Sequence, residues 1–200
     1  MRGGVYGRSV DNSYESVLIS TQGDGSALTN STTPTSLLPA AAKTKIWPLF
    51  CRNPEKILKI TAHGRISTVV TTPGTLTIAA RFIDSAATSV DVVSSGAMTL
   101  NTVAQTNTPW ILELWAHVRA LGSTATLFGY GRFQSHAVIG SAAIGTGGAG
   151  TQMLPYNAAP AVGTAFNALL ENQIDLFATW SIANAANSIT LHNFMVESLN

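Results

Sequence analysis

The side chains that could carry out acid–base or metal chemistry are few and lie far apart in this chain. Its ten carboxylates form no local cluster, and no histidine has a second histidine or a cysteine at metal-ligand spacing. The histidines are His63, His117, His136 and His192. We expect them to be polar residues on sheet faces; the alternative is a metal or pH-sensing site assembled at a subunit contact.

Two further sequence features also indicate no reaction chemistry. Gly145–Gly150 is rich in glycine but lacks the Lys-Ser/Thr that completes a phosphate-binding loop, so it predicts a flexible loop. Cys51 is the only cysteine and is expected to be a buried thiol. A glycosidase could bring two distant carboxylates together in space, but the chain has no Gly-x-Ser-x-Gly elbow for a nucleophilic serine. We therefore predict a protein that is not an enzyme, with no catalytic residue, metal or cofactor.

One strand has a face with the composition of a binding surface. In the strand at 112–119, Glu113, Trp115, His117 and Arg119 alternate with apolar residues. Tryptophan and arginine are enriched at interface hot spots. The alternative is that a neighbouring segment covers this face, with the charged residues at its edges. The segment 152–166 is a second candidate contact. The predicted interface residues are Trp115, His117, Arg119, Met153 and Tyr156.

The elements that position these residues follow a two-residue period from Ile57 onward. Three segments have an apolar residue at every second position, at 75–82, 112–119 and 174–181. Thr72–Thr75 has the Pro-Gly pair of a type II turn, and Gly140–Gly163 predicts an exposed loop. About eight short strands predict an all-β fold, an antiparallel jelly-roll sandwich.

The segment that precedes these strands has a different composition. Residues 1–35 are rich in Gly, Ser, Thr and Asn and contain one brief apolar cluster, so we expect an extended N-terminal arm that is disordered or lies on a neighbour. Residues 36–43 predict one short helix, since a proline precedes three alanines. The jelly-roll domain is expected to span residues 36–200.

The composition excludes several classes of partner. The chain is 46% hydrophobic and 10% charged, with a formal net charge of +1. Such a small charge makes no long-range field to concentrate nucleic acid or anionic lipid. No stretch reaches the roughly 20 apolar residues of a membrane span. Met1–Val10 contains no apolar secretory segment, which predicts synthesis and assembly in the cytoplasm.

Several turn and strand motifs resemble a group of small virion structural proteins of tailed bacteriophages. The motifs are Leu58–Ser67, Thr72–Ile78, Asn107–Trp110, Leu121–Ser123, Ala178–Ser181 and Asn187–Leu191. The resemblance covers roughly residues 36–200 and assigns no binding residue. It implies jelly-roll proteins that form homotrimers and decorate the capsid lattice.

On this resemblance, we expect a capsid decoration, or cement, protein located at the virion's capsid surface. Its partners would be two further copies of itself and the major capsid protein, with no nucleic acid and no membrane. Many modest contacts, repeated over a lattice, would add up through avidity. The alternative is a carbohydrate- or receptor-binding module on the tail or fibre.

Overall fold

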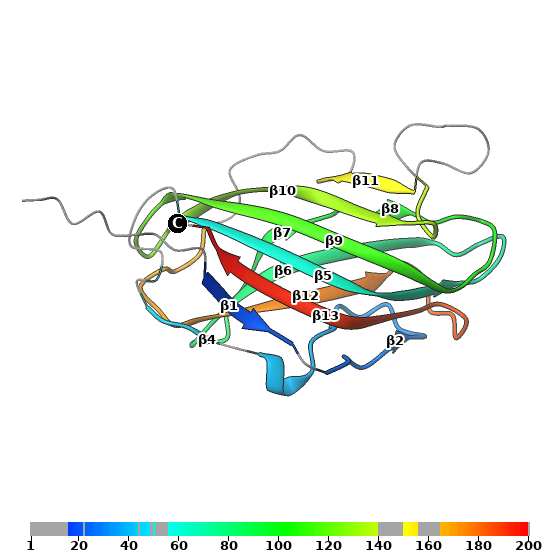
Figure 1. The fold of residues 1–200 in the computed structure, drawn as a ribbon, viewed down its shortest axis with the longest axis horizontal. Helices are drawn as coiled ribbons and strands as arrows, with labels where there is room; N and C mark the ends of the chain where they lie inside the picture. Colours follow the sequence, from blue (N-terminus) through cyan, green and yellow to red (C-terminus); the bar gives the residue numbers. More distant parts are fainter. Residues whose placement is uncertain are drawn as a thin grey trace, which may run out of the picture.

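The computed structural model describes residues 16–21, 23–43, 45–48, 50, 56–139, 150–155 and 165–199. These residues form thirteen β-strands and one short 3-10 turn, η1 (Ala40–Ala42). The strands make two antiparallel sheets that stack as the layers of a sandwich (Figure 1). The prediction of an all-β antiparallel sandwich is therefore confirmed.

Sheet A contains the longer strands and, in Figure 1, faces the viewer. Its strand order is β1-β13-β5-β9-β10-β11, with β2 also paired to β13. The bounds are β1 (Ser16–Ser20), β2 (Leu28–Thr29), β5 (Ile57–Thr68), β9 (Gln105–Ala120), β10 (Thr126–Ser135), β11 (Thr151–Leu154) and β13 (Ser188–Ser198).

Sheet B lies behind sheet A in the same view. Its order is β3-β12-β6-β7, with β4 paired to β12 and β8 paired to β6. The bounds are β3 (Thr35–Ser36), β4 (Lys45–Ile46), β6 (Thr75–Asp84), β7 (Ser89–Ser94), β8 (Met98–Thr99) and β12 (Asn172–Trp180).

The core lies between the sheets and is built from the apolar face of each alternating strand. The four apolar positions expected to share one face in each of β6, β9 and β12 are all at most 2% exposed. They are Leu76, Ile78, Ala80, Phe82, Leu112, Leu114, Ala116, Val118, Ile174, Leu176, Ala178 and Trp180. Two-residue periodicity therefore identified the buried faces, as strand geometry requires.

Strands early in the chain pair with strands late in the chain, and the middle strands pair with each other. β5 pairs with β13, β6 with β12, and β9 with β10. In the usual jelly roll the β9–β10 pair would extend the sheet of β6 and β12; here it extends sheet A, beside β5. The strand order therefore departs from the standard jelly roll at this pair.

A glycine allows the two sheets to approach each other closely where β10 crosses β7. A Cβ atom built on Gly129 would lie 2.3 Å from Cγ2 of Val93 and 3.0 Å from the carbonyl oxygen of Val92. No side chain fits there without movement of β7. The glycine at 129 therefore sets the spacing of the layers under this part of sheet A.

The expected N-terminal arm differs from the structure in its described part. β1 and β2 pair with β13 in sheet A, and β3 pairs with β12 in sheet B. Ile19 and Leu28 are 4% and 5% exposed and belong to the core. The expectation that this segment is disordered or lies on a neighbour was therefore wrong for residues 16–21 and 23–35, because its few apolar residues find burial on the chain's own sheets. Residues 1–15 lie outside the described residues.

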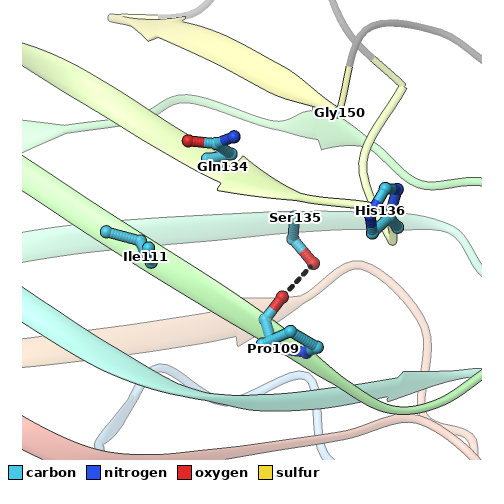
Figure 2. Close-up of a pocket in the computed structure, with 6 residues that line it drawn as sticks. All are labelled: Pro109, Ile111, Gln134, Ser135, His136 and Gly150. Atoms are coloured by element: carbon cyan, nitrogen blue, oxygen red, sulfur yellow. Dashed lines mark hydrogen bonds between the residues drawn. The ribbon is translucent and has the colours of Figure 1, made fainter.

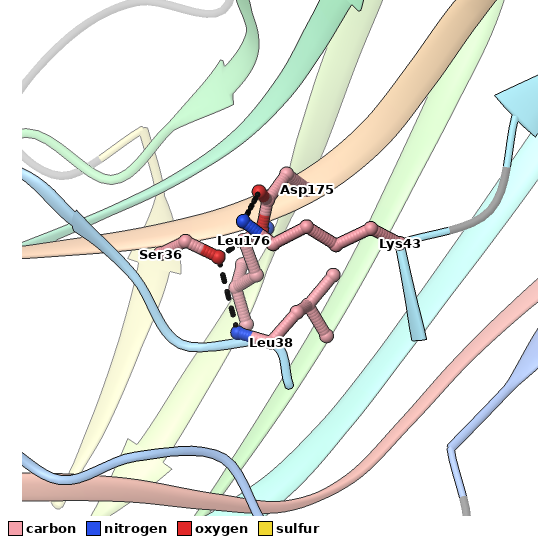
Figure 3. A network of polar contacts seen from close by, with 5 residues as sticks. All are labelled: Ser36, Leu38, Lys43, Asp175 and Leu176. Carbon is pink, nitrogen blue, oxygen red and sulfur yellow. Dashed lines mark hydrogen bonds and ion pairs between the residues drawn. The ribbon is translucent and has the colours of Figure 1, made fainter. Parts of the chain in front are cut away.

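The expected helix at 36–43 is reduced to η1, in a segment that crosses the edge of sheet B (Figure 3). This segment is held by Asp175 of β12, whose side chain is fully buried. Oδ1 of Asp175 accepts hydrogen bonds from the hydroxyl of Ser36 (2.6 Å) and the amide of Leu176 (2.8 Å). Oδ2 accepts no hydrogen bond from any residue that the structure describes, but it faces the ammonium of Lys43 at 3.2 Å.

The strands are longer than the alternating segments, and one lies in the expected loop. β9 begins at Gln105, ahead of the expected strand at 112–119. β10 continues through Gly131, because an inward-facing glycine does not interrupt pairing with β9. β11 lies inside the expected loop at 140–163 and pairs with β10; residues 140–149 and 156–163 lie outside the described residues.

Candidate functional site

The register of β9 and β10 places aromatic side chains next to one another on the outer face of sheet A. Trp115 lies opposite Tyr130, and His117 lies opposite Phe128. These four residues alternate with the buried core positions of their strands, so they point away from the sandwich. We name Trp115, His117, Phe128 and Tyr130, together with Arg119, the aromatic face.

The rings of the aromatic face pack against one another. Trp115 and Tyr130 are stacked, with centroids 5.6 Å apart and planes 14° apart. His117 is stacked on the same tyrosine, at 5.6 Å and 25°, and Phe128 is tilted against it at 5.9 Å. Aromatic pairs at such distances contribute about 0.5–1.5 kcal/mol beyond their burial. Tyr130 is therefore the centre of a preorganised cluster.

Arg119 completes this cluster at the end of β9. Its guanidinium carbon lies 5.2 Å from the ring centroid of Phe128, which is a cation–π distance. Arg119 itself is exposed. A guanidinium that stacks on a ring through its flat surface keeps N–H groups at its edge available to acceptors. The end of the aromatic face thus offers hydrogen-bond donors to a partner.

The pKa of His117 is shifted by its surroundings in the aromatic face. Burial of the imidazole lowers its pKa below the ordinary value of 6.5, and the nearby positive charge of Arg119 lowers it further. Its Nε2 atom is buried and has no hydrogen-bond partner among the described residues. Both observations favour the neutral ring at neutral pH, packed as an aromatic group on Tyr130.

Charged residues surround the aromatic face in cross-strand pairs. Arg132 of β10 forms an ion pair with Glu113 of β9, its directly opposite neighbour. Lys59 of β5 lies 3.3 Å from Glu197 of β13. Lys59 is also directly opposite Trp115, so this pair adjoins the aromatic cluster. In Figure 1, no described strand or turn lies over this side of sheet A.

The structure brings together three of the five predicted interface residues. Trp115, His117 and Arg119 belong to the aromatic face, as the alternation in β9 predicted. Met153 is 65% exposed on the edge strand β11, where it pairs with Arg132. It therefore extends the same side of sheet A but lies outside the ring cluster. Tyr156 lies outside the described residues.

Sequence reasoning missed half of the aromatic cluster, namely Phe128 and Tyr130. Both lie in β10, a strand that is not among the three alternating segments recognised in the sequence. A signal was present, because Phe128, Tyr130 and Arg132 alternate with two glycines. Their pairing with β9 depends on register, however, and register was not determined by the pattern alone.

One surface groove contains both a serine and a histidine. Figure 2 shows a groove of about 170 Å³ lined by Pro109, Ile111, Gln134, Ser135, His136 and Gly150. The hydroxyl of Ser135 donates to the carbonyl of Pro109 at 3.0 Å and accepts from the amide of Ala137 at 3.2 Å. Because both of its roles are taken, Ser135 is not poised as a nucleophile.

Comparison with known proteins identifies no relative of this chain. No family model, no curated protein and no solved structure matches it. Within the described ranges, no group of three or more His, Cys, Asp or Glu side chains could hold a metal ion. Nor does any described helix have the length and apolar character to cross a membrane.

Proposed function

We propose that this protein is a non-enzymatic structural protein of a phage virion, most specifically a capsid decoration protein. In this proposal, it is assembled in the host cytoplasm, forms a homotrimer and binds the major capsid protein at the capsid surface. The motif resemblance between residues 58 and 191 supports this setting. The antiparallel sandwich is the architecture that such proteins have.

The observation that carries the proposal is the packing of rings on the aromatic face. Sugar recognition by stacking requires an open ring surface. Tyr130 instead has Trp115 and His117 stacked on it and Phe128 tilted against it. Rings locked together with an adjacent arginine have the composition of a protein–protein hot spot, where rigid aromatic groups lose little entropy on binding. We therefore assign this face to a protein contact.

A second function, glycan or receptor binding on the tail, is favoured by a different surface. Trp47 is 76% exposed and lines a groove of about 180 Å³ with Leu18, Ile46 and Phe50, among other residues. An exposed indole beside an apolar groove can stack on a sugar ring. If this is the function, a W47A variant would lose glycan binding whereas a W115A variant would keep it.

The two functions are separated by locating the protein on intact particles. Gold-labelled antibody against the protein should mark many positions over the head if it decorates the capsid. A few copies at the tail tip, together with binding of the pure protein to immobilised glycans, would contradict the proposal and support the second function. Light scattering after size-exclusion chromatography tests the expected trimer.

A further inference from the structure

Sheet B contains an arginine whose surroundings provide a comparison for Arg119. The guanidinium carbon of Arg81 lies 4.5 Å from the ring centroid of Phe177, and its Nε atom donates to Oδ1 of Asp91 at 2.6 Å. The ring covers the flat side of the cation and the carboxylate binds its edge. Arg81 is therefore the cation of a three-member set that also contains a ring, Phe177, and a carboxylate, Asp91.

Arg119 and its ring partner form the first two members of such a set. No carboxylate in the part of the chain that the structure describes pairs with Arg119. Its ring partner is Phe128, at 5.2 Å, and no described ion pair includes it. The carboxylate nearest along β9, Glu113, is already paired with Arg132. An exposed guanidinium fixed on a ring is a preformed binding group for a planar anion.

The charges around the aromatic face have a consistent orientation. In the Arg132–Glu113 pair, the cation is 53% exposed and the carboxylate 20%. In the Lys59–Glu197 pair, the corresponding values are 29% and 13%. The anions are therefore the inner members of both pairs, and the cations are presented to solvent. Together with Arg119, they give this side of sheet A a positive outer layer around apolar rings.

We propose that Arg119, stacked on Phe128, receives an Asp or Glu side chain from an acidic surface of a partner protein. Apolar residues beside that carboxylate would pack on Trp115 and Tyr130. This inference rests on the proposed function, in which the partner is the major capsid protein. A second copy in a two-fold contact is disfavoured, because symmetry would bring the same cation-rich face against itself.

The first experiment measures binding of the pure protein to virions that lack it, at 50, 150 and 500 mM NaCl. R119Q should weaken binding at 50 mM about tenfold or more, because it removes one side of a charge-assisted contact. It should also reduce the dependence on salt, since one screened ion pair is gone. R119K should fall between wild type and R119Q, because lysine keeps the charge but loses the planar edge.

R65Q is the matched control, since Arg65 is an exposed arginine of sheet A opposite Pro109, well away from the aromatic face along β5. It should change the affinity less than twofold. Equal affinities of wild type and R119Q would overturn the inference while leaving the decoration function intact. If the wild type binds no particle, the proposed function fails. Carboxylate binding by Arg119 is then tested by a second experiment, which needs no virion.

That second experiment titrates ¹⁵N-labelled protein with poly-L-glutamate and follows the side-chain N–H signals of Arg119 and Trp115. Both signals should shift in a saturable way at low salt in the wild type, and the Trp115 signal should stay still in R119Q. Poly-L-lysine should cause no shift. Shifts spread evenly over the protein, or none at all, would refute a carboxylate receptor at this position.

One rival source of the carboxylate lies in the same chain. Glu55 precedes Lys56, whose carbonyl accepts the amide hydrogen bond of Val118, the residue before Arg119. If E55Q alone moved the Arg119 side-chain signal in the free protein and increased the response to poly-L-glutamate, the site would be filled internally and the inference would be wrong. An unchanged Arg119 signal in E55Q would support an Arg119 side chain that is open to a partner's carboxylate.

Discussion

Gly129→Ala tests whether the close approach of β10 to β7 depends on the missing side chain at position 129. The added Cβ would lie 2.3 Å from Cγ2 of Val93, whereas carbon atoms at rest are about 3.5–4.0 Å apart. More than about 1 Å of movement is therefore needed, and Val93 is β-branched and has little rotamer freedom. Overpacking of this kind costs about 1–3 kcal/mol. For a chain of this length, that corresponds to roughly 2–12 °C in Tm.

The assay is urea unfolding followed by circular dichroism, with Gly23→Ala as the matched control, because a Cβ on Gly23 meets no atom within 4 Å. The control should leave stability within about 0.5 kcal/mol of wild type. Val93→Ala alone should cost about 1.5 kcal/mol for two lost methyl groups. In that background, Gly129→Ala should cost clearly less, since Cγ2 of Val93 is gone and only the Val92 carbonyl oxygen at 3.0 Å and Cβ of Val93 at 3.3 Å still crowd the added Cβ. An undiminished cost in the double variant would refute the steric explanation.

Three further predictions concern the buried carboxylate, the histidine and the ring stack. D175N should lower the free energy of unfolding by about 2–3 kcal/mol in urea titrations, because Lys43 then loses its buried counter-charge; an unchanged midpoint would contradict this. The pKa of His117 is lowered in the folded state, so the unfolded chain binds more protons and stability should fall as pH drops through 6.5. H117Q should remove that part of the pH dependence, measured in guanidinium at several pH values. A double-mutant cycle of W115A and Y130A should give a coupling of about 0.5–1.5 kcal/mol, and additive effects would show that the stack is not energetically connected.

The parts of the fold that sequence could predict are those governed by burial. Leu76 to Phe82 and Leu112 to Val118 alternate without interruption, and a two-residue period has only one way to bury its apolar set. The face of Trp115 and His117 followed from the same alternation. These features are local, so the order of residue types along one strand is enough to indicate them.

The missed features depend on contacts between distant segments. Ser16–Ser20 pairs with β13, which lies near the other end of the sequence. Nothing in the sequence of Ser16–Ser20 itself indicates this partner. The glycines at 129 and 131 resemble turn signals in the sequence, but both lie inside one strand, β10. Glycine is required at these positions because neighbouring atoms occupy the space that a side chain would take. The ring pair of Trp115 and Tyr130 likewise exists only once β9 and β10 are in register.

The pairing of β5 with β13 has a consequence for how the protein acquires its structure. β5 is a central strand of sheet A, and one of its two edges stays open until a strand more than a hundred residues later has been synthesised. Contacts of such long separation slow folding, because loop-closure entropy is lost before they form. While the polypeptide is growing on the ribosome, that edge is free to pair with other nascent chains. Ribosome-bound fragments that stop before Ser188 should therefore be sensitive to protease and prone to aggregate, and protection should appear abruptly once β13 emerges.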